Sequence, residues 1–324
     1  MNKPLITVGL TTYNSSETVK KALMSIKTQN WQPLEIIIVD DASTDNTREI
    51  VNELIKYFDK VRLIINKVNS GVAVSRNKIL CEASGEFVVF FDDDDESLPD
   101  RISKQYKRII EYERDFASGS PVICHTARQV VYPDGRIILQ PSVGEQINTA
   151  APSGPAFIKR VLIGLPVKNS YGSSATCSQM ARLSTYHLVG NFDPNLRRGE
   201  DTDFCIRLAE KGGHFVGISS PLVIQTMTKT SEKNLNDELK VYQYLISKHR
   251  KIIEKYSSYD FVVEFYKLRN AWYSEKWTNF FKQLMFLVFK YPFLTSQRLI
   301  LAINNISIHK AFKDFHKIKK HKID

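Results

Sequence analysis

The sequence predicts an α/β protein with a Rossmann-like, mainly parallel central sheet and flanking helices, followed by a basic helical extension. Short β-branched runs alternate with helical periodicity through the first hundred residues, which is the pattern of βαβ units. Of the 324 residues, 43% are hydrophobic and 25% are charged. This composition is typical of a folded, soluble protein with a large core, so disordered and fibrous classes are excluded.

The first strand is expected over 5–12, where the run LITVGLTT is apolar and β-branched. Ser15 or Ser16 can cap the next helix, whose apolar residues share one face: Val19, Ala22, Leu23 and Ile26. The run EIIIVD over 35–40 is apolar on both faces, as a buried parallel strand is. The alternation then continues as helix, strand, helix, strand and helix: 44–58, 61–66, 70–83, 86–91 and 100–114.

The second half of the chain is less regular. Two runs over 121–132 and 136–140, joined through Pro133-Asp134-Gly135, are typical of a hairpin. We then expect a short helix, a strand, a helix closed by Gly212-Gly213 and a last strand: 156–163, 175–181, 201–211 and 215–219. From about Leu239 the pattern is helical and rich in aromatic residues, so we expect two domains, 1–235 and 236–324.

The net charge of +10 lies in the C-terminal quarter. Residues 1–245 carry equal numbers of basic and acidic side chains, whereas 246–324 carry 16 Lys and Arg against 6 Asp and Glu. These basic residues lie on amphipathic, Phe-rich helices and in a lysine tail, not on a sheet face suited to base stacking. We therefore expect no nucleic-acid partner, and a basic nucleic-acid-binding protein is the alternative from another functional class.

We expect this quarter to bind an anionic membrane surface, or alternatively to pack on the first domain or form a homodimer interface. Its apolar residues at helical spacing are Trp272, Trp277, Phe280, Phe281, Leu284, Met285, Leu287, Val288 and Phe289. Its lysines are Lys276, Lys282, Lys290, Lys310, Lys313, Lys317, Lys319, Lys320 and Lys322. Charges and Pro292 interrupt the stretch 280–303, so no spanning helix is expected. Four scattered cysteines and an N-terminus without a signal-peptide pattern favour a cytoplasmic protein, peripheral on the inner face of the cell membrane.

Three polar clusters follow predicted strands, at the sheet edge where open parallel sheets bind ligands. They are Thr11-Thr12-Tyr13-Asn14, Asp40-Asp41-Ala42-Ser43 and Asp92 to Asp95. Four carboxylates repel a diphosphate unless a cation lies between, and Mg²⁺ or Mn²⁺ prefers such oxygen ligands. The dinucleotide-binding and P-loop glycine motifs are absent, and the spacing of an EF-hand fails, so those three classes of site are not expected.

Four ordered motifs over about 1–225 resemble the inverting glycosyltransferases of family 2, which have the GT-A fold. They are ITVGLTTYN, EIIIVDDASTDNT, NSGVAVSRNKILCEASGEFVVFFDDDD with LPDR, and VGNFDPNLRRGEDTDFCIRLAEKGG. The resemblance implies transfer from a nucleotide-sugar, usually a UDP-sugar, to a glycan or lipid-linked glycan, with a divalent metal on the diphosphate. It also suggests bacterial surface-polysaccharide assembly. A nucleotidyltransferase is the alternative among enzymes, although LTTYNSSE lacks a Gly-rich phosphate loop.

The resemblance implies roles for individual residues. The nucleotide-sugar would be bound by Thr11, Tyr13, Asp41, Arg76, Asp92 and Asp93. Tyr13 would stack on the base and Asp41 would accept a hydrogen bond from it. Asp94 would contact the metal, Mn²⁺ or Mg²⁺, in a register that the four consecutive Asp residues leave ambiguous by one. Arg76, in the family's R-N pair with Asn77, would help hold the donor.

The resemblance also implies that Asp201, in the family's E-D motif, is the general base. An inverting transfer is a single displacement, so one carboxylate must remove the acceptor proton while a cation absorbs charge on the leaving phosphate. Glu200 or Asp203 could instead cap the helix that begins here. Two departures matter: the Q-x-x-R-W motif of processive members is absent, which favours transfer of a single sugar, and no His follows the last strand. His214 precedes that strand, so a third metal ligand stays open.

Overall fold

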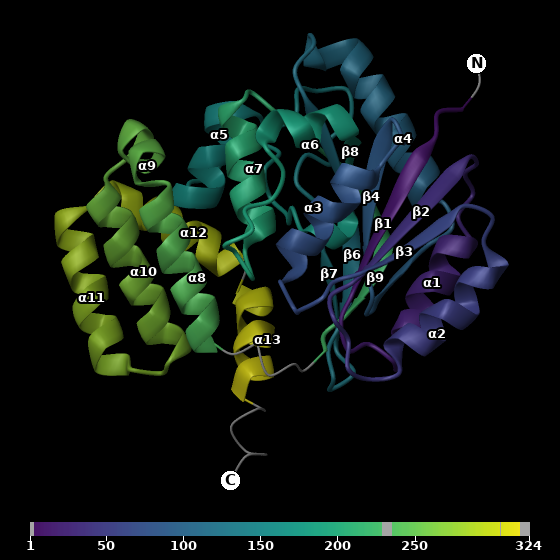
Figure 1. Cartoon of the computed structure of the whole chain (residues 1–324). Coiled ribbons are helices and arrows are strands. Elements are labelled where there is room, and N and C mark those ends of the chain that lie inside the picture. Colours follow the sequence, from purple (N-terminus) through teal and green to yellow (C-terminus); the bar gives the residue numbers. More distant parts are fainter. Residues whose placement is uncertain (1–2, 229–234, 305, 318–324) are drawn as a thin grey trace. The chain divides into compact units, whose positions relative to one another are not determined.

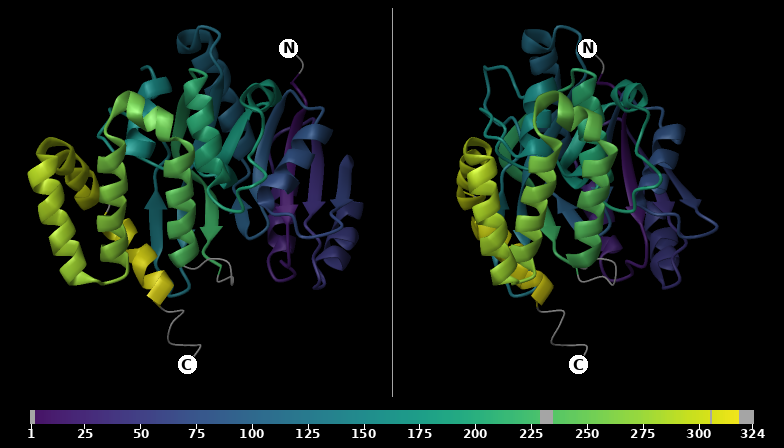
Figure 2. Two further views of the ribbon diagram at one scale, coloured as in Figure 1. Left: turned by 60° about the vertical axis from the view of Figure 1, so that its left-hand side comes forward. Right: turned by 90° about the vertical axis from the view of Figure 1, so that its left-hand side faces the viewer.

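The computed structural model describes residues 3–228, 235–304 and 306–317, and the chain divides into two compact units (Figure 1). One unit contains residues 1–154 and 169–228, and the other contains 155–168 and 229–324. The first is a sheet covered by helices and the second is helical (Figure 2). The sequence suggested 1–235 and 236–324, whereas residues 155–168 group with the helical unit and the longer segment of that unit starts at 229.

The first unit is built on a nine-stranded sheet within the described residues, with the order β3-β2-β1-β4-β8-β6-β9-β5 and β7 paired to β6. Its first four strands along the chain pair in parallel: β1 (Ile6–Thr12), β2 (Leu34–Asp40), β3 (Val61–Ile65) and β4 (Phe87–Asp92). The remaining strands are β5 (Asp95–Ser97), β6 (Val122–Val131), β7 (Ile137–Gln140), β8 (Gln179–Arg182) and β9 (His214–Thr226). The predicted α/β class and the predicted hairpin of β6 and β7 are confirmed.

Two strands differ from the prediction. β5 lies in the acidic run and pairs antiparallel with β9, although Asp and Glu are uncommon in strands. β9 continues to Thr226, well past the predicted end at 219, because a register shift opposite Thr126 to Arg128 lets it pass Pro221 and resume pairing with β6. Both strands position residues of the acidic run, as described below.

The helices of this unit are α1 (Val19–Lys27), α2 (Thr47–Leu54), α3 (Val72–Glu82), α4 (Arg101–Tyr112), α6 (Leu183–Val189) and α7 (Glu200–Glu210). A short 3₁₀ turn over Ile55–Tyr57 follows α2, and a π-helical turn over Glu113–Ala117 follows α4. The predicted strand over 175–181 is instead a 3₁₀ turn, Thr176–Ser178, followed by β8. Helix α6 is too short to give a periodic signal and was not predicted.

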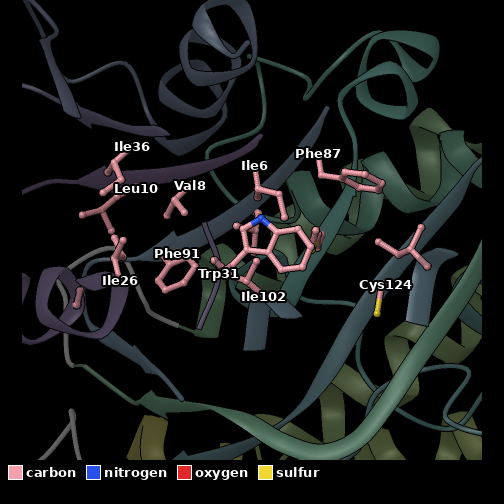
Figure 3. Close-up of a cluster of buried hydrophobic side chains, with 14 of the residues drawn as sticks. Ile6, Val8, Leu10, Ile26, Trp31, Ile36, Phe87, Phe91, Ile102 and Cys124 are labelled. Atoms are coloured by element: carbon pink, nitrogen blue, oxygen red, sulfur yellow. The ribbon is translucent and has the colours of Figure 1, made fainter. Parts of the chain in front are cut away.

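The two faces of the sheet carry different layers of the core. Ile6, Val8 and Leu10 of β1 lie in one hydrophobic cluster with Ile36 and with Ile102 of α4 (Figure 3). On the other face, Gly9 approaches α3 so closely that a Cβ would lie 2.7 Å from a methyl carbon of Ile79. Phe90 of β4 packs there edge-on against Tyr186 of α6. Because successive side chains of a strand point to opposite faces, β1 and β4 are packed on both sides. Their carboxyl ends carry the candidate site.

The helical unit consists of α5 (Gly154–Ile158), which starts at its edge, and α8 to α13. These are α8 (Leu235–Lys248), α9 (Arg250–Tyr256), α10 (Tyr259–Tyr273), α11 (Trp277–Lys290), α12 (Pro292–Asn304) and α13 (Ile306–Lys317). Helix α10 lies beside α8 and α11 (Figures 1 and 2). Buried Arg298 donates hydrogen bonds to the carbonyl of Ile163 and, at 3.1 Å, to the hydroxyl of Tyr242. These bonds join residues 155–168 to α8 and α12.

The predicted apolar surface of the C-terminal quarter is partly corrected. Leu287 is fully buried and belongs to the core of the unit, and Trp272, Phe280 and Leu284 are half-buried. The exposed apolar residues of α11 are Trp277, Phe281, Met285, Phe286, Val288 and Phe289. Lys313 pairs with Glu275 at 3.0 Å, so it does not belong to the exposed lysines. The side chain of Lys317, and Lys319, Lys320 and Lys322, lie outside the described residues. No helix in the described part of the chain has both the length and the apolar character that crossing a bilayer requires.

Candidate functional site

The loops after β1 and β4 meet at the carboxyl edge of the sheet. In the strand register, Thr11 lies between Val39 of β2 and Asp92 of β4. Thr11 is buried, whereas the Tyr13 side chain two residues later is 42% exposed. The backbone N–H of Tyr13 donates a 3.0 Å hydrogen bond to Oδ2 of Asp93. The structure therefore brings four of the predicted donor-binding residues together, and one of them, Asp93, holds the loop that carries Tyr13.

Asp93 lies in an environment that favours its neutral form. Burial, followed by the charge of Asp94, raises the pKa of Asp93 to about 7, against the opposing effect of hydrogen bonds from Tyr13, Ser15 and Thr12. Its carboxyl group faces the loop after β1. This position gives Asp93 a role in fixing the loop, in addition to any contact with a ligand.

Asp41 organises the loop between β3 and α3. Its Oδ1 accepts hydrogen bonds from Nδ2 of Asn66 at 2.6 Å and from the backbone N–H of Ser70 at 3.0 Å. Its Oδ2 accepts from the backbone N–H of Gly71 at 2.7 Å, and Gly71 has φ +93°, a value that favours glycine. A carboxylate offers about four acceptor positions, so one remains beyond these three bonds. Sequence reasoning missed Asn66, although its place directly after a strand is a usable signal.

The four consecutive Asp residues have separate partners. Asp92 accepts a 2.9 Å hydrogen bond from Arg76, and Asp94 accepts one of 2.7 Å from the hydroxyl of Thr228, just after β9. Asp95, only 5% exposed, accepts a 3.1 Å bond from the backbone N–H of Thr226. The pairing of β5 with β9 thus places Asp94 and Asp95 beside the end of β9.

The acidic run contains a group suited to a divalent cation. Among the described residues, ligand atoms of Asp92, Asp95 and Cys177 lie within 4.8 Å of one another. Oδ2 of Asp95 is buried and has no hydrogen-bond partner in the described part of the chain. Burial, then the charges of Asp94 and Asp92, raises the pKa of Asp95 well above its usual range. Two carboxylates fit Mg²⁺ or Mn²⁺, whereas the Cys177 thiol does not, because burial raises its pKa and keeps it protonated. Asp94, the predicted metal ligand, is adjacent to this group but not within it.

Arg76 connects the acidic run to helix α7. Its Nη1 donates a 2.5 Å hydrogen bond to Oε1 of Glu200, and its Nη2 bonds Asp92. Burial alone would lower the pKa of Arg76, but the charges of Asp92 and Glu200 raise it. The side chain that the resemblance assigned to the donor therefore bonds two carboxylates of the protein itself. Asn77, the next residue, exchanges two hydrogen bonds with the backbone of Phe192, at 2.8 and 2.9 Å.

Asp201, the predicted base, lies in the first turn of α7. The helix begins after Gly199, whose φ of +72° lies in the left-handed region that favours glycine. Asp201 is half-buried and its Oδ1 accepts a 2.6 Å bond from the backbone N–H of Thr202. The two alternative carboxylates have other partners: Glu200 bonds Arg76, and the fully buried Asp203 pairs with Arg207 at 2.8 Å.

Comparisons with known proteins are consistent with this geometry. Residues 7–161 match the family model Glycosyl transferase family 2. The chain is 33% identical to the putative teichuronic acid biosynthesis glycosyltransferase TuaG of Bacillus subtilis, over 41% of this chain and 57% of that protein. It is 40% identical to the GalNAc(5)-diNAcBac-PP-undecaprenol beta-1,3-glucosyltransferase of Campylobacter jejuni, over 31% of this chain and 33% of that one. The match thus spans 57% of the first relative and about a third of the second.

The fold is also that of solved structures. The S. aureus TarS 1-349 structure in complex with UDP-GlcNAc superposes with a TM-score of 0.62 at 17% sequence identity, covering 98% of this chain and 91% of that chain. The same fragment in complex with UDP gives a TM-score of 0.61 at 18% identity, covering 98% and 91%. This likeness confirms the predicted GT-A fold.

Proposed function

The chain belongs to glycosyl transferase family 2, and from this premise we propose that it transfers a single sugar from a nucleotide-sugar to a glycan or lipid-linked glycan acceptor, with inversion. The donor we propose is a UDP-sugar and the process is cell-surface polysaccharide biosynthesis. One observation carries the proposal: Arg76 joins Asp92, at the end of β4, to the helix turn that contains Asp201. Family membership favours this function over the nucleotidyltransferase and nucleic-acid-binding alternatives.

The names of related proteins support the substrate classes. TarS binds UDP-GlcNAc in its solved complex, which favours a UDP-sugar donor. The C. jejuni relative is named for a glucosyl transfer to an undecaprenol-linked glycan, and TuaG for teichuronic acid biosynthesis. We therefore assign the acceptor to the class of glycans or lipid-linked glycans.

We assign the donor site to the edge formed by the loops after β1, β2 and β4. Thr11 and Tyr13 would line the nucleobase pocket, with the exposed ring of Tyr13 available for stacking. Asp41 has an acceptor position left for the base. Asp92 and Asp93 would face the ribose or the sugar, and Arg76 would act on the donor through Asp92.

In the reaction, Asp201 takes the proton from the acceptor hydroxyl as its oxygen attacks the anomeric carbon. The bond from that carbon to the diphosphate oxygen breaks on the opposite side, so the anomeric configuration inverts. Mn²⁺ or Mg²⁺, held by Asp94 with Asp92 and Asp95, would offset the negative charge of the diphosphate when bound. One carboxylate base therefore suffices for the protein's part in the proton transfer.

Donor binding is expected to depend on metal. UDP should bind at least about tenfold more weakly in EDTA than in Mn²⁺, because the diphosphate then faces the carboxylates of the acidic run without a cation between. Asp94→Asn and Asp95→Asn should each reduce the gain in UDP affinity that Mn²⁺ provides. The substitution that reduces this gain more identifies the principal metal ligand. Titration calorimetry of UDP measures this, with Asp134→Asn, an exposed carboxylate in the β6–β7 turn, as the matched control. Equal UDP affinity in EDTA and in Mn²⁺ would contradict the metal assignment.

The Tyr13 ring is expected to contribute to nucleotide affinity. Tyr13→Ala should weaken UDP binding by about tenfold, in the range of base stacking on an aromatic ring, whereas Tyr13→Phe should bind normally. Tyr57→Ala removes a ring that is 66% exposed on the α2 side and serves as the control. If Tyr13→Ala binds UDP as tightly as the unaltered chain, the nucleobase does not stack there.

We further propose that the helical unit holds the protein on an anionic membrane, at the cytoplasmic face of the cell membrane. Support comes from α11, where Trp277, Phe281, Met285 and Val288 form an exposed apolar stripe at i, i+4, i+8 and i+11. On α12, Phe293 is 82% exposed. The sequence from 276 through 313 contains no Asp or Glu, and four exposed lysines lie within it: Lys276, Lys282, Lys290 and Lys310. A homodimer interface is the competing use of this surface.

A further inference from the structure

Arg76 is enclosed and has both ends of its guanidinium engaged. It is 4% exposed, with Nη1 2.5 Å from Oε1 of Glu200 and Nη2 2.9 Å from Oδ1 of Asp92. The rings of Phe90 and Phe192 each lie with their centroids 5.7 Å from the guanidinium carbon. A side chain held in this way has a fixed position, so it acts through the groups it bonds and not as a mobile ligand for the donor.

The two carboxylates that Arg76 bonds come from distant parts of the chain. Asp92 ends β4 and is in register with Thr11, at the proposed donor edge. Glu200 is the first residue of α7 and immediately precedes Asp201. Glu200 follows Gly199, whose φ of +72° lies in the left-handed region, so the helix starts directly at a turn of the loop before it. The bond from Arg76 to Glu200 supplies a fixed point there.

Asn77 supports the same arrangement from the same helix. Its side chain exchanges two hydrogen bonds with the backbone of Phe192, the residue whose ring lies against Arg76. A lysine could not replace Arg76, because one ammonium group cannot present the planar fork that bonds two carboxylates at once. Helix α3 thus fixes, through two consecutive side chains, both the ring that packs on the guanidinium and the carboxylates that bond it.

Arg76, Glu200 and Asp92 place two negative charges and one positive charge close to Asp201. Burial, and then the charge of Asp201 against the opposing charge of Arg76, raises the pKa of Glu200 to about 7. Arg76 and Glu200 act on each other. The other charged groups that act on them are Asp92 from β4 and Asp201 from α7. Removing one of the three charges near Asp201 changes the electrostatic potential there, and the sign depends on which one is removed.

We propose that Arg76 is a positioning residue that fixes the first turn of α7, and therefore the base Asp201, relative to the donor edge at Asp92. The inference rests on the proposed function, in which Asp201 is the base and the donor binds at that edge. It replaces direct donor binding by Arg76 with action through Asp92 and Glu200.

The test compares Arg76→Lys, Arg76→Met and Glu200→Gln in the full chain, with Mn²⁺ and with UDP-GlcNAc and UDP-glucose as probes. Hydrolysis or transfer should show kcat lowered by about 10²-fold in Arg76→Lys, the loss expected when a reacting group is displaced by about 1 Å, with the donor KM changed far less. The acidic limb of the pH profile of kcat/KM should move to lower pH in Glu200→Gln and to higher pH in Arg76→Met, each by about one unit. If Arg76 and Glu200 only stabilised the fold, the acidic limb would not move in opposite directions in these two variants.

Arg182→Lys is the matched control, because Arg182 also bonds two carboxylates, Glu86 and Glu113, but does so at the amino end of β4. It should leave both kcat and the pH limb unchanged. If Arg76→Lys keeps kcat within twofold of the unaltered chain, or if the limbs do not move in opposite directions, the inference is wrong while the proposed function stands.

Turnover by the unaltered chain tests the proposed function separately. If the unaltered chain neither binds UDP nor turns over the probes, the proposed function is wrong. Hydrogen exchange of the backbone amides over 200–204 then tests whether Arg76 fixes the first turn of α7. Exchange there should increase in Arg76→Lys and not in Arg182→Lys. Unchanged exchange in Arg76→Lys would overturn the positioning of α7 by Arg76.

Discussion

Asp201→Asn is expected to lower kcat for transfer by about 10²–10⁴-fold while UDP binds with nearly unchanged affinity. The amide keeps the size and hydrogen bonding of the side chain but cannot take the acceptor's proton. Among the described residues, only Oδ1 of Asp201 is seen to accept hydrogen bonds, both from Thr202. In the proposed reaction, Oδ2 would take the proton of the acceptor hydroxyl. Steady-state kinetics with a UDP-sugar donor and calorimetry with UDP measure the two quantities.

Asp203→Asn provides the matched control for this substitution. It makes the same chemical change two residues later on α7, at a fully buried carboxylate that pairs with Arg207. It should lower the thermal stability, because it breaks a buried ion pair, and should change kcat by less than about tenfold. If Asp201→Asn retained more than about a tenth of the kcat of the unaltered chain, the base would be another residue, with Glu200 the first to examine.

The parallel half of the sheet was predictable because its signals are local. Each of β1, β2 and β4 is a short apolar run flanked by helical periodicity, and such runs define buried parallel strands. β5 gave no such signal, because its first residue is the fourth Asp of the acidic run and its pairing partner is 130 residues away at Gln225. The sequence likewise did not indicate that residues 155–168 belong to the helical unit, because that placement depends on the bond from Arg298 to Ile163.

The candidate site was predictable in its composition but not in its pairing. Carboxylates after successive parallel strands must gather at one edge, so the acidic run, Asp41 and Tyr13 could be grouped from the sequence. The bond between Arg76 and Glu200 joins residues 124 positions apart, and no spacing rule connects them. The sequence also could not predict the buried Oδ2 of Asp95, because its position follows from the pairing of β5 with β9.

The exposed surface of α11 and α12 is expected to bind vesicles that contain anionic lipid. Phe289 and Phe293 are 79% and 82% exposed, which is unusual for large apolar side chains on a surface without a partner. Lys276, Lys282 and Lys290 lie on the same helix or next to it, with aliphatic stems long enough to reach beside the apolar stripe. Each lysine near a negatively charged surface contributes about 1 kcal/mol, so these three together account for about a 100-fold change in affinity.

Co-sedimentation with phosphatidylcholine vesicles, with and without phosphatidylglycerol, measures this binding. Binding should require the anionic lipid, weaken as salt shortens the screening length, and fall by about 100-fold when Lys276, Lys282 and Lys290 are all changed to Gln. Changing three exposed lysines of the other unit, Lys20, Lys56 and Lys60, alters the net charge equally and should have little effect. Phe281→Ser with Phe289→Ser should also reduce binding, because the rings no longer enter the interface. If the chain ignores anionic vesicles at low salt but sediments as a dimer that the two Ser substitutions dissociate, the apolar stripe is a subunit interface and the membrane assignment is wrong.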